Sequence, residues 1–412
     1  MADLTLDEQV SLLMRGTDYG DETLKQAMAM ELRQRLIEAE KEGRKLRVYC
    51  GFDPRTSDLH LGHTVPMRKM RQFQELGHEV TMVIGRFTSL VGDPSDKDKV
   101  RAQLTLEQAG LNAETYAEQA FKILDPDRTQ VVYNDAWLSK LTLKDFIQLA
   151  SHFTMQQFLA RDAFRSRWER EDPIFLHEFF YALMQGYDAY HLKTDVQIGG
   201  SDQLFNIVTA ARKLMEALGE KPNIGVIHGI LPGTDGVVKM SKSLGNHIPL
   251  ISSPEDMYGK VMSVPDAAMG DYFRLVTRWT PTEIEEIEAG MASGMLHPRD
   301  VKMQLAREIV EIYHGEQAGE PAEAAFRRVF QKREIPENLA EITLKPGQTL
   351  VDVMLQAEFV SSLSEARRLI KQGGVRLDGA TQDDQRKVLD IPKSQVLRVG
   401  KRRFVRLLPP EK

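Results

Sequence analysis

The chain is poor in cysteine: Cys50 is its single thiol in 412 residues. One cysteine forms no intramolecular disulfide and builds no multi-cysteine zinc site, so we expect no structural zinc and a reducing, cytoplasmic compartment. No apolar run approaches the ~20 residues that span a bilayer. Residues 1–14 lack the charged-then-apolar pattern of an export signal. These features predict a protein with no membrane partner.

The overall composition is that of an ordinary globular protein, with 42% hydrophobic and 28% charged residues. A chain of 412 residues exceeds one ordinary core, so two or three domains are expected. The net charge of -6 is unevenly spread, because residues 347–412 carry 13 Lys or Arg against 8 Asp or Glu. A basic end on an acidic body indicates a nucleic-acid module attached to an enzyme.

Strand-like and helix-like segments alternate over the first 250 residues. The strand-like segments are 46–52, 79–84, 131–133, 196–198 and 224–231, and helix-like segments include 23–42, 64–76 and 206–218. This alternation predicts an α/β fold in which helices cover both faces of a parallel sheet. Residues 142–172 are expected to be helical.

After Pro254 the strand-like segments stop, and residues up to 333 read as helical. A break with prolines at 336 and 346 precedes a last block of two helix-like segments and short strands. We therefore expect four parts: a catalytic domain at 1–252 with a helical insertion at about 142–190, an all-α domain at 253–335, a linker at 336–346 and a small α+β domain at 347–412.

Two short segments, about 180 residues apart, carry most of the functional signal. The segment His60–His63 reads His-Leu-Gly-His and stands where a strand-like run gives way to a helix. The free N–H groups of a first helical turn favour an anion, and two imidazoles can donate to phosphate oxygens. Gly62 lets a ligand approach the backbone closely. The alternative is a helix cap with one packed histidine.

The second segment, Lys239–Ser243, reads Lys-Met-Ser-Lys-Ser and lies in a loop of small residues. Lys239 and Lys242, with the hydroxyls of Ser241 and Ser243, can close over a pyrophosphate leaving group. A solvated run of charge is the alternative. Together the two segments predict a clamp for a nucleoside triphosphate.

In this order and at this spacing the two signatures resemble those of class I aminoacyl-tRNA synthetases, which carry them on a Rossmann-like catalytic domain. Three further segments resemble the tyrosyl-tRNA synthetase family, of the bacterial type with a C-terminal S4-like RNA-binding domain. They are residues 49–54, the Gly-Asp-Pro-Ser of residues 92–95, and a helix with a Tyr-x-x-x-Gln-x-x-Asp pattern at 181–188 followed by residues 197–203. The resemblance covers residues from about 8 to 408, essentially the whole chain.

The resemblance implies an enzyme that activates L-tyrosine with ATP to tyrosyl-adenylate and transfers tyrosine to tRNA(Tyr). His60, His63, Lys239 and Lys242 would catalyse by positioning and charge stabilisation, without a protein nucleophile. Mg²⁺ would accompany ATP through its phosphates, with no dedicated protein metal site and no organic cofactor. The resemblance also implies a homodimer with an interface around 153–175.

The amino-acid pocket is predicted on one helical face, because spacings of four and three residues bring polar side chains together there. The resemblance assigns the tyrosine site to Tyr49, Asp93, Tyr181, Gln185, Asp188 and Gln203. Asp188 would accept the proton of the substrate phenol while Tyr49 donates to it, and Gln203 would face the carboxylate. A solvated helix face is the alternative for the helical stripe, and a core position is the alternative for Tyr49.

The resemblance assigns the ATP site to Gly51, Asp53, Thr56, His60, Gly62, His63, Gly200, Asp202, Lys239, Ser241, Lys242 and Ser243. Asp202 follows a strand, where acids bond ribose hydroxyls in Rossmann folds. Asp53 has a turn residue before proline as its alternative. The family often has Thr where this chain has Arg55, so we hypothesise that Arg55 or Thr56 supplies the missing phosphate contact.

Contacts with tRNA are expected from two places. Lys97 and Arg101 may be read as neighbours of the acceptor end or as a solvated helix start, beside Asp96, where the family usually has Gly. Residues 350–377 resemble an S4-type module whose helix carries Arg367, Arg368 and Lys371. Such cations meet phosphates and make affinity salt-dependent, although a basic helix on an inert appendage is the alternative.

Three other functions remain open. A tryptophanyl-tRNA synthetase of the same fold is disfavoured by Asp188 and Tyr49, because an indole N–H is only a donor. A small nucleotidyltransferase shares the first signature but usually lacks the helical and basic domains. A non-catalytic RNA-binding synthetase paralogue is disfavoured by the presence of both histidines and both lysines.

Overall fold

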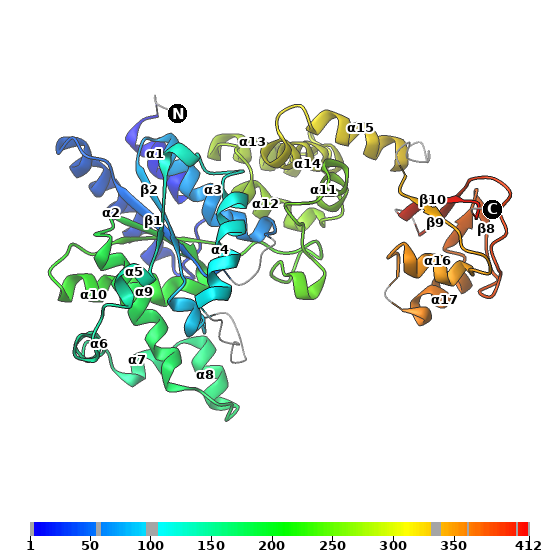
Figure 1. The fold of residues 1–412 in the computed structure, drawn as a ribbon. Helices are drawn as coiled ribbons and strands as arrows, with labels where there is room; N and C mark the ends of the chain where they lie inside the picture. The colour runs from blue at the N-terminus through cyan, green and yellow to red at the C-terminus, as the bar shows by residue number, and fades with distance from the viewer. Residues whose placement is uncertain are drawn as a thin grey trace. The chain divides into compact units, whose positions relative to one another are not determined.

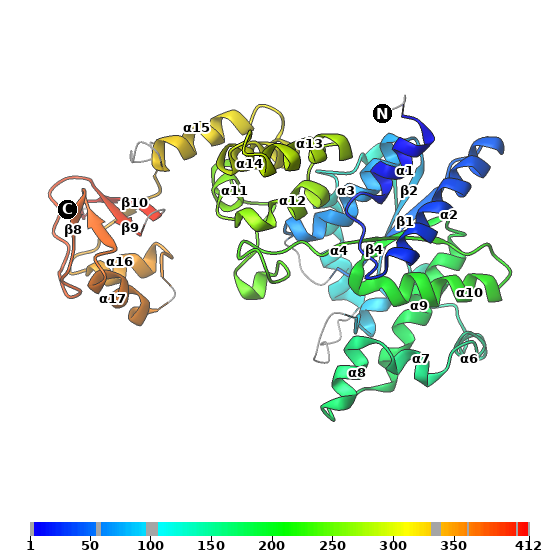
Figure 2. The ribbon, with the colours of Figure 1, turned by 180° about the vertical axis from the view of Figure 1, so that it is seen from behind.

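The computed structural model describes residues 4–54, 59–95, 106–330, 339–360, 362–400 and 403–410. The chain divides into two compact units, residues 1–320 and 321–412. Figures 1 and 2 show the ribbon from opposite sides. Among the described residues, no helix combines the length and the apolar character needed to cross a bilayer.

A five-stranded parallel sheet forms the centre of the first unit. Its strands are β1 (Arg47–Phe52), β2 (Glu79–Ile84), β3 (Thr129–Tyr133), β4 (Val196–Gly200) and β5 (Ile224–His228). The order is β3-β2-β1-β4-β5, and every residue of β4 and β5 is buried, as in strands covered on both faces. The strand order reverses between β1 and β4, which opens a crevice at their carboxyl ends. The predicted parallel sheet is confirmed.

Helices cover both faces of this sheet (Figure 1). One side carries α1 (Leu6–Met14), α2 (Glu22–Lys41) and α3 (Leu61–Glu75), and the other carries α9 (Phe180–His191), the π-helical η5 (Phe205–Ala211) and α10 (Arg212–Ala217). Met184 and Ala189 of α9 pack with Tyr49 and Val83 of the sheet. The helix predicted at 206–218 therefore begins as a π-helix, which seven residues of apolar periodicity do not distinguish from an α-helix.

The helical stretch predicted at 142–172 consists of three short helices. They are α6 (Leu143–Ala150), α7 (Met155–Leu159) and α8 (Asp162–Glu169), and α4 (Leu106–Ala120) and α5 (Asp135–Leu138) precede them. Thr154 starts α7 because its side chain and that of Gln157 cap each other's backbone N–H groups. This capping box was present in the sequence, and it is the reason that one long helix does not form.

Helices alone follow in the first unit. They are α11 (Pro254–Met262), α12 (Met269–Val276), α13 (Pro281–Ala292) and α14 (Pro298–His314), and α15 (Gly319–Phe330) runs into the second unit. Ser253, Thr280 and His297 cap α11, α13 and α14, each followed by a proline in the first helical turn. The all-α region is confirmed. Because α12 packs on α3, the boundary at 252 stays a prediction.

The second unit holds a small mixed sheet with two helices. Its elements are β6 (Glu341–Thr343), α16 (Leu350–Gln356), α17 (Leu363–Lys371), β7 (Val375–Leu377), β8 (Ala380–Thr381), β9 (Gln395–Val399) and β10 (Arg403–Leu408). The strand order is β6-β10-β9-β7-β8, and Leu350, Ile370 and Leu397 lie in its core. The α+β character is confirmed. Residues 341–343, expected in the linker, instead pair with β10, since three residues are too few to show alternation.

A buried carboxylate ties together the amino ends of β1 and β4. Asp195 accepts hydrogen bonds from Arg35 Nη1 of α2 at 3.1 Å, from Arg44 Nη1 at 2.9 Å and from the Arg47 backbone N–H at 3.0 Å. Burial alone would raise the pKa of Asp195, but the Arg47 N–H and the charges of Arg44 and Arg47 outweigh it and lower that pKa. The carboxylate therefore stays ionised and compensates Arg35, which is 4% exposed.

Substitution of Asp195→Asn should lower the free energy of unfolding by about 3 kcal/mol at pH 7, because it removes the nearer of the two carboxylates of buried Arg35 and leaves only Glu38, at 3.8 Å. The wild-type contribution is complete above the unfolded pKa of ~3.9 and is lost as pH falls through the lower folded pKa. Urea unfolding followed by circular dichroism measures both effects. The matched control is Asp172→Asn, whose partner Arg170 lies at 2.9 Å with both side chains more than 40% exposed. Equal losses in the two variants would refute the assignment.

Candidate active site

The two signature segments meet at the crevice, at the amino end of α3. The Leu61 backbone N–H donates to Ile248 O at 3.0 Å, and the Leu250 N–H donates to Leu59 O at 3.0 Å. A side chain added at Gly62 would place its Cβ 3.0 Å from the His60 ring and 3.5 Å from Met240 Cβ. The tight contact is with the capping ring, so Gly62 leaves room for the His60 cap, whereas the distance to Met240 is ordinary van der Waals contact.

The first signature caps its own helix. The Gly62 N–H donates to His60 Nδ1 at 3.2 Å, and the His60 N–H donates to His63 Nδ1 at 3.2 Å. The two rings stack with centroids 3.8 Å apart. Because both Nδ1 atoms accept hydrogen bonds, the proton of each neutral imidazole resides on Nε2. The pair thus presents two Nε2–H donors, as phosphate binding requires.

The expectation that free backbone N–H groups would hold an anion here is wrong. The Leu61 N–H is bonded to Ile248 O, the Gly62 N–H to His60 Nδ1, and the His63 N–H to His60 O at 2.9 Å. The histidine cap and residues 248–250 accept the hydrogen bonds of these N–H groups. A phosphate at this terminus would therefore meet the imidazole side chains rather than free backbone N–H groups.

Both imidazoles are neutral at pH 7. Burial, followed by His63, His247 and Lys239, lowers the pKa of His60 to about 3, and burial with Lys239 lowers the pKa of His63 to about 4. Because both rings are neutral, they do not repel each other electrostatically before a ligand binds. A polyphosphate would offset the positive surroundings and strengthen their hydrogen bonds.

The second signature is linked to the end of β4. Lys239 Nζ lies 3.2 Å from Asp202 Oδ2, and Ser241 Oγ lies 3.0 Å from Ser243 Oγ. Asp202, predicted to bond ribose hydroxyls, is an ion-pair partner of Lys239 in this structure. Lys242 is exposed at the start of the short η6 (Lys242–Leu244). The loop that carries these lysines therefore lies at the carboxyl ends of the strands, near His60.

A chain of hydrogen bonds runs from β1 to α9. Tyr181 OH donates to Asp53 Oδ2 at 3.1 Å, and Thr88 Oγ1 donates to Asp53 Oδ1 at 2.8 Å. Asn134 Nδ2 lies 3.2 Å from both Thr88 Oγ1 and Asp188 Oδ2. The chain connects the helical stripe predicted on α9 with the turn after β1. A polar lining of this kind holds its members in place before a substrate enters.

The remaining predicted tyrosine-site residues lie in the same region. Tyr49 OH donates to Gln185 O at 3.3 Å, and Gln203 Nε2 donates to Asp93 Oδ2 at 2.6 Å. Gln185 Oε1 is buried with no hydrogen-bond partner among the described residues, which leaves an acceptor for a donor such as an ammonium. The structure therefore brings the predicted tyrosine residues together, and their roles remain predictions.

Asp188 is a buried carboxyl with an unusual pKa. Burial raises the pKa of Asp188 to about 7, while hydrogen bonds from Trp137 Nε1 at 2.7 Å and from Asn134 lower it, and Asp53 raises it. Tyr49 lies close enough for the Asp188 charge to raise its pKa further, after burial. The Asp188 carboxyl and the Tyr49 hydroxyl thus lie near each other, and a carboxylate beside a hydroxyl is suited to a phenol.

The remaining predicted residues lie partly within and partly outside the described part of the chain. A Cβ at Gly51 would meet no heavy atom within 4 Å, which leaves room over the end of β1, whereas one at Gly200 would lie 2.6 Å from Asp202 Oδ1. Thr56, Arg55, Lys97 and Arg101 lie outside the described residues. In the second unit the helix α17 exposes Arg367, Arg368 and Lys371.

Sequence reasoning missed several residues that support the site. Besides Trp137, Asn134 and Thr88, Arg161 Nη2 donates to Ser95 Oγ at 2.7 Å and Asn206 Nδ2 donates to Gln203 Oε1 at 3.0 Å. Asn134 directly follows β3, so its place at the carboxyl end of a strand was an available signal. Arg161 and Thr88 stand in no pattern that distinguishes them from surface residues.

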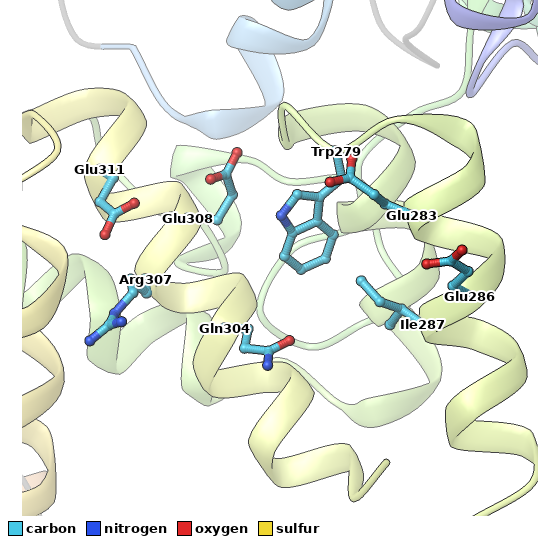
Figure 3. Close-up of a pocket in the computed structure, with 8 residues that line it drawn as sticks. All are labelled: Trp279, Glu283, Glu286, Ile287, Gln304, Arg307, Glu308 and Glu311. Atoms are coloured by element: carbon cyan, nitrogen blue, oxygen red, sulfur yellow. The ribbon is translucent and has the colours of Figure 1, made fainter. Parts of the chain in front are cut away.

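A cavity of about 340 Å³ lies elsewhere in the first unit, among α13 and α14 (Figure 3). It is lined by Trp279, Glu283, Glu286, Ile287, Gln304, Arg307, Glu308 and Glu311. None of these residues belongs to the signatures or to the tyrosine pocket. The cavity is therefore separate from the candidate active site.

Comparisons with known proteins agree with this geometry. Residues 41–331 match the family model of tRNA synthetases class I (W and Y), and residues 348–396 match the S4 domain model. The tyrosine–tRNA ligase of Moorella thermoacetica is 48% identical over 92% of this chain and 91% of its own length. That of Thermotoga maritima is 44% identical over 98% of each chain.

A solved structure is similar in fold. The tyrosyl-tRNA synthetase of Archaeoglobus fulgidus, complexed with L-tyrosine, superposes with a TM-score of 0.60 at 25% identity and covers 78% of this chain and all of its own. The paired signatures, the reversed strand order and the near full-length relatives all lead to the same assignment. The chain belongs to the tyrosyl-tRNA synthetase family of class I aminoacyl-tRNA synthetases.

Proposed function

We propose that this chain is a tyrosine–tRNA ligase that activates L-tyrosine with ATP and transfers it to tRNA(Tyr). The observation that carries the proposal has two parts. The two signatures lie together at the amino end of α3, and the Asp188 carboxyl of α9 lies near the Tyr49 hydroxyl of β1, as an acceptor and a donor for a phenol. Full-length similarity to curated tyrosine–tRNA ligases supports the same activity.

The first step forms tyrosyl-adenylate. A carboxylate oxygen of tyrosine attacks the α-phosphorus of ATP in line, and the bond to the bridging oxygen breaks, so that pyrophosphate leaves. His60 and His63 donate from Nε2 to phosphate oxygens, and Lys239 and Lys242 neutralise the charge of the leaving group. Mg²⁺ enters with ATP as the counter-ion of its phosphates.

The second step consumes the adenylate. A terminal ribose hydroxyl of tRNA attacks the tyrosyl carbonyl carbon, the bond to the phosphate oxygen breaks, and AMP leaves with the electron pair. Positioning is sufficient for this transfer, since the phosphate is a good leaving group. The exposed cations of α17, Arg367, Arg368 and Lys371, would contact tRNA phosphates.

Selection of tyrosine is proposed to depend on Asp188 and Tyr49. An ionised Asp188 would accept from the phenol hydroxyl, and Tyr49 would turn its hydroxyl from Gln185 O to donate to it. Phenylalanine would form neither hydrogen bond, and the buried Asp188 charge would lack that donor. Tryptophan is disfavoured less strongly than phenylalanine. Its indole N–H can donate to Asp188, but it cannot accept a hydrogen bond from Tyr49.

A second copy of the chain is proposed as a partner. The region predicted as the interface carries exposed apolar side chains at Met155, Trp168 and Phe175, with exposed fractions of 50%, 65% and 48%. Burial of such side chains by a symmetric copy is a common use of an apolar surface, and light scattering of the purified protein would report the mass.

A cytoplasmic location is proposed from cysteine usage. The single cysteine, Cys50, is a free thiol and forms no disulfide within the chain.

The test of the function is amino-acid-dependent exchange between ATP and pyrophosphate, with tyrosine, phenylalanine and tryptophan compared in parallel. We expect exchange with tyrosine only, and transfer to tRNA(Tyr) when the tRNA is added. Exchange with tryptophan alone would replace the substrate. Tight tRNA binding without any exchange would favour the non-catalytic paralogue.

Trp137→Phe should lower kcat/KM for tyrosine about tenfold at pH 7, because the indole donates to the Asp188 carboxylate and helps to keep it ionised. Since the pKa of Asp188 is raised to about 7, the wild-type kcat/KM should rise as pH increases through that value. The midpoint in the variant should lie at higher pH. Exchange assays between pH 5.5 and 9 measure both, with Leu143→Ala, which shortens a 77% exposed side chain of α6, as control. An unshifted midpoint would contradict the role of Trp137.

Joint replacement of Arg367, Arg368 and Lys371 by Ala should weaken tRNA binding and reduce its salt dependence, while tyrosine exchange stays unchanged. Substitution is preferable to removal of residues 347–412, because β6 would lose its partner β10. Filter binding at several salt concentrations measures the effect. Lys393→Ala, also exposed in this unit, is the control. An unchanged salt dependence would show that α17 is not in contact with the tRNA.

A further inference from the structure

One short stretch, residues 246–250, is attached to both signatures, and we call it the connecting segment. At its start the Asn246 side chain belongs to the second signature: Oδ1 accepts from the Ser241 N–H at 2.8 Å, and Nδ2 lies 3.3 Å from both Val238 O and Lys239 O. Asn246 is 6% exposed. The amide therefore holds the turn of the second signature from inside.

The rest of the connecting segment is bonded to the first signature. Ile248 O accepts from the Leu61 N–H, and the Leu250 N–H donates to Leu59 O, so the backbone runs beside residues 59–61. One of these bonds is made by the residue directly before His60, and the other by the residue directly after it. Residue 247 is consequently held between the two signatures, both of which are assigned to the ATP site.

His247 occupies this position, and no role was predicted for it. Its ring centroid lies 6.1 Å from that of His60, with the planes at 62°. Burial, then Lys260 and Lys242, lower the pKa of His247, so the ring is a neutral imidazole in a positive environment. Its Nδ1 is buried and has no hydrogen-bond partner among the described residues.

A neutral imidazole carries its proton on one of its two ring nitrogens, so an unpartnered Nδ1 can donate or accept, and a nearby anion favours the tautomer with the proton on Nδ1. The positive environment of Lys242 and Lys260 and the neighbouring Nε2–H donors of His60 and His63 favour an anion with several oxygens. A half-turn about χ2, a torsion with two broad minima, exchanges Nδ1 with Cδ2 and brings Nδ1 to the other side of the ring. The side chain can therefore turn its donor to a ligand at low cost.

We propose that His247 is a third imidazole of the phosphate site and donates a hydrogen bond from Nδ1 to the triphosphate of ATP. The inference rests on the proposed function and adds to it a residue outside both signatures. The connecting segment supplies the ring to His60 at a fixed distance, so that ATP would be held by residues from three stretches of the chain.

The experiment compares His247→Ala, His247→Asn and His247→Gln by ATP–pyrophosphate exchange with tyrosine. Asn places its amide donor at the position of Nδ1, whereas Gln places it near Nε2. His247→Ala should raise KM for ATP about tenfold, as expected for one hydrogen bond to a charged group, and should leave KM for tyrosine unchanged. His247→Asn should recover most of the loss, and His247→Gln should not.

The matched control is Ile251→Ala, which shortens a 65% exposed side chain directly after the connecting segment. It should leave both KM values unchanged. A wild-type KM for ATP in His247→Ala would overturn the proposal. So would a loss shared equally by all three variants and accompanied by a higher KM for tyrosine, because a merely structural role would have that effect.

The two proposals fail in different ways. If the wild-type protein shows no exchange with any amino acid, the proposed function is wrong, and calorimetric titration of ATP into wild-type and His247→Ala then tests the residue alone. Equal ATP affinities would overturn the role of His247. About tenfold weaker binding by the variant would support it, whatever reaction the site performs.

Discussion

The backbone pairing of residues 59–61 with residues 248–250 is the contact on which the candidate active site depends. It holds a helix amino end against a loop that is about 180 residues away in the sequence. Gly62 leaves room for the His60 ring that caps the same helix end, because a side chain there would crowd that ring. The pairing places the segment that follows the two lysines beside the segment that carries the two histidines.

Burial of polar groups sets the protonation states on both sides of the site. On the phosphate side burial keeps His60 and His63 neutral, so that they donate hydrogen bonds without repelling each other. On the tyrosine side burial brings the pKa of Asp188 to about 7, and hydrogen bonds from Trp137 and Asn134 oppose the shift. The same physical effect thus prepares donors for an anion and an acceptor for a phenol.

Much of the fold followed from periodicity. The five strands and the long helices lie within a few residues of their predicted places, because apolar runs and alternation report burial directly. The errors are local. The stretch at 142–172 breaks at a capping box, η5 widens to a π-helix, and β6 is too short to show a pattern. Each depends on hydrogen bonds rather than on apolar spacing.

The sequence by itself determined the family, the parallel sheet and the identity of the signature residues, because these depend on residue types at fixed spacings. Only the tertiary structure decided what each side chain contacts: that the first-turn N–H groups of α3 are already bonded, that Lys239 pairs with Asp202, and that Trp137 donates to Asp188. His247 likewise acquires meaning only beside His60. Contacts between distant segments are set by packing in three dimensions, and local patterns of residues do not encode them.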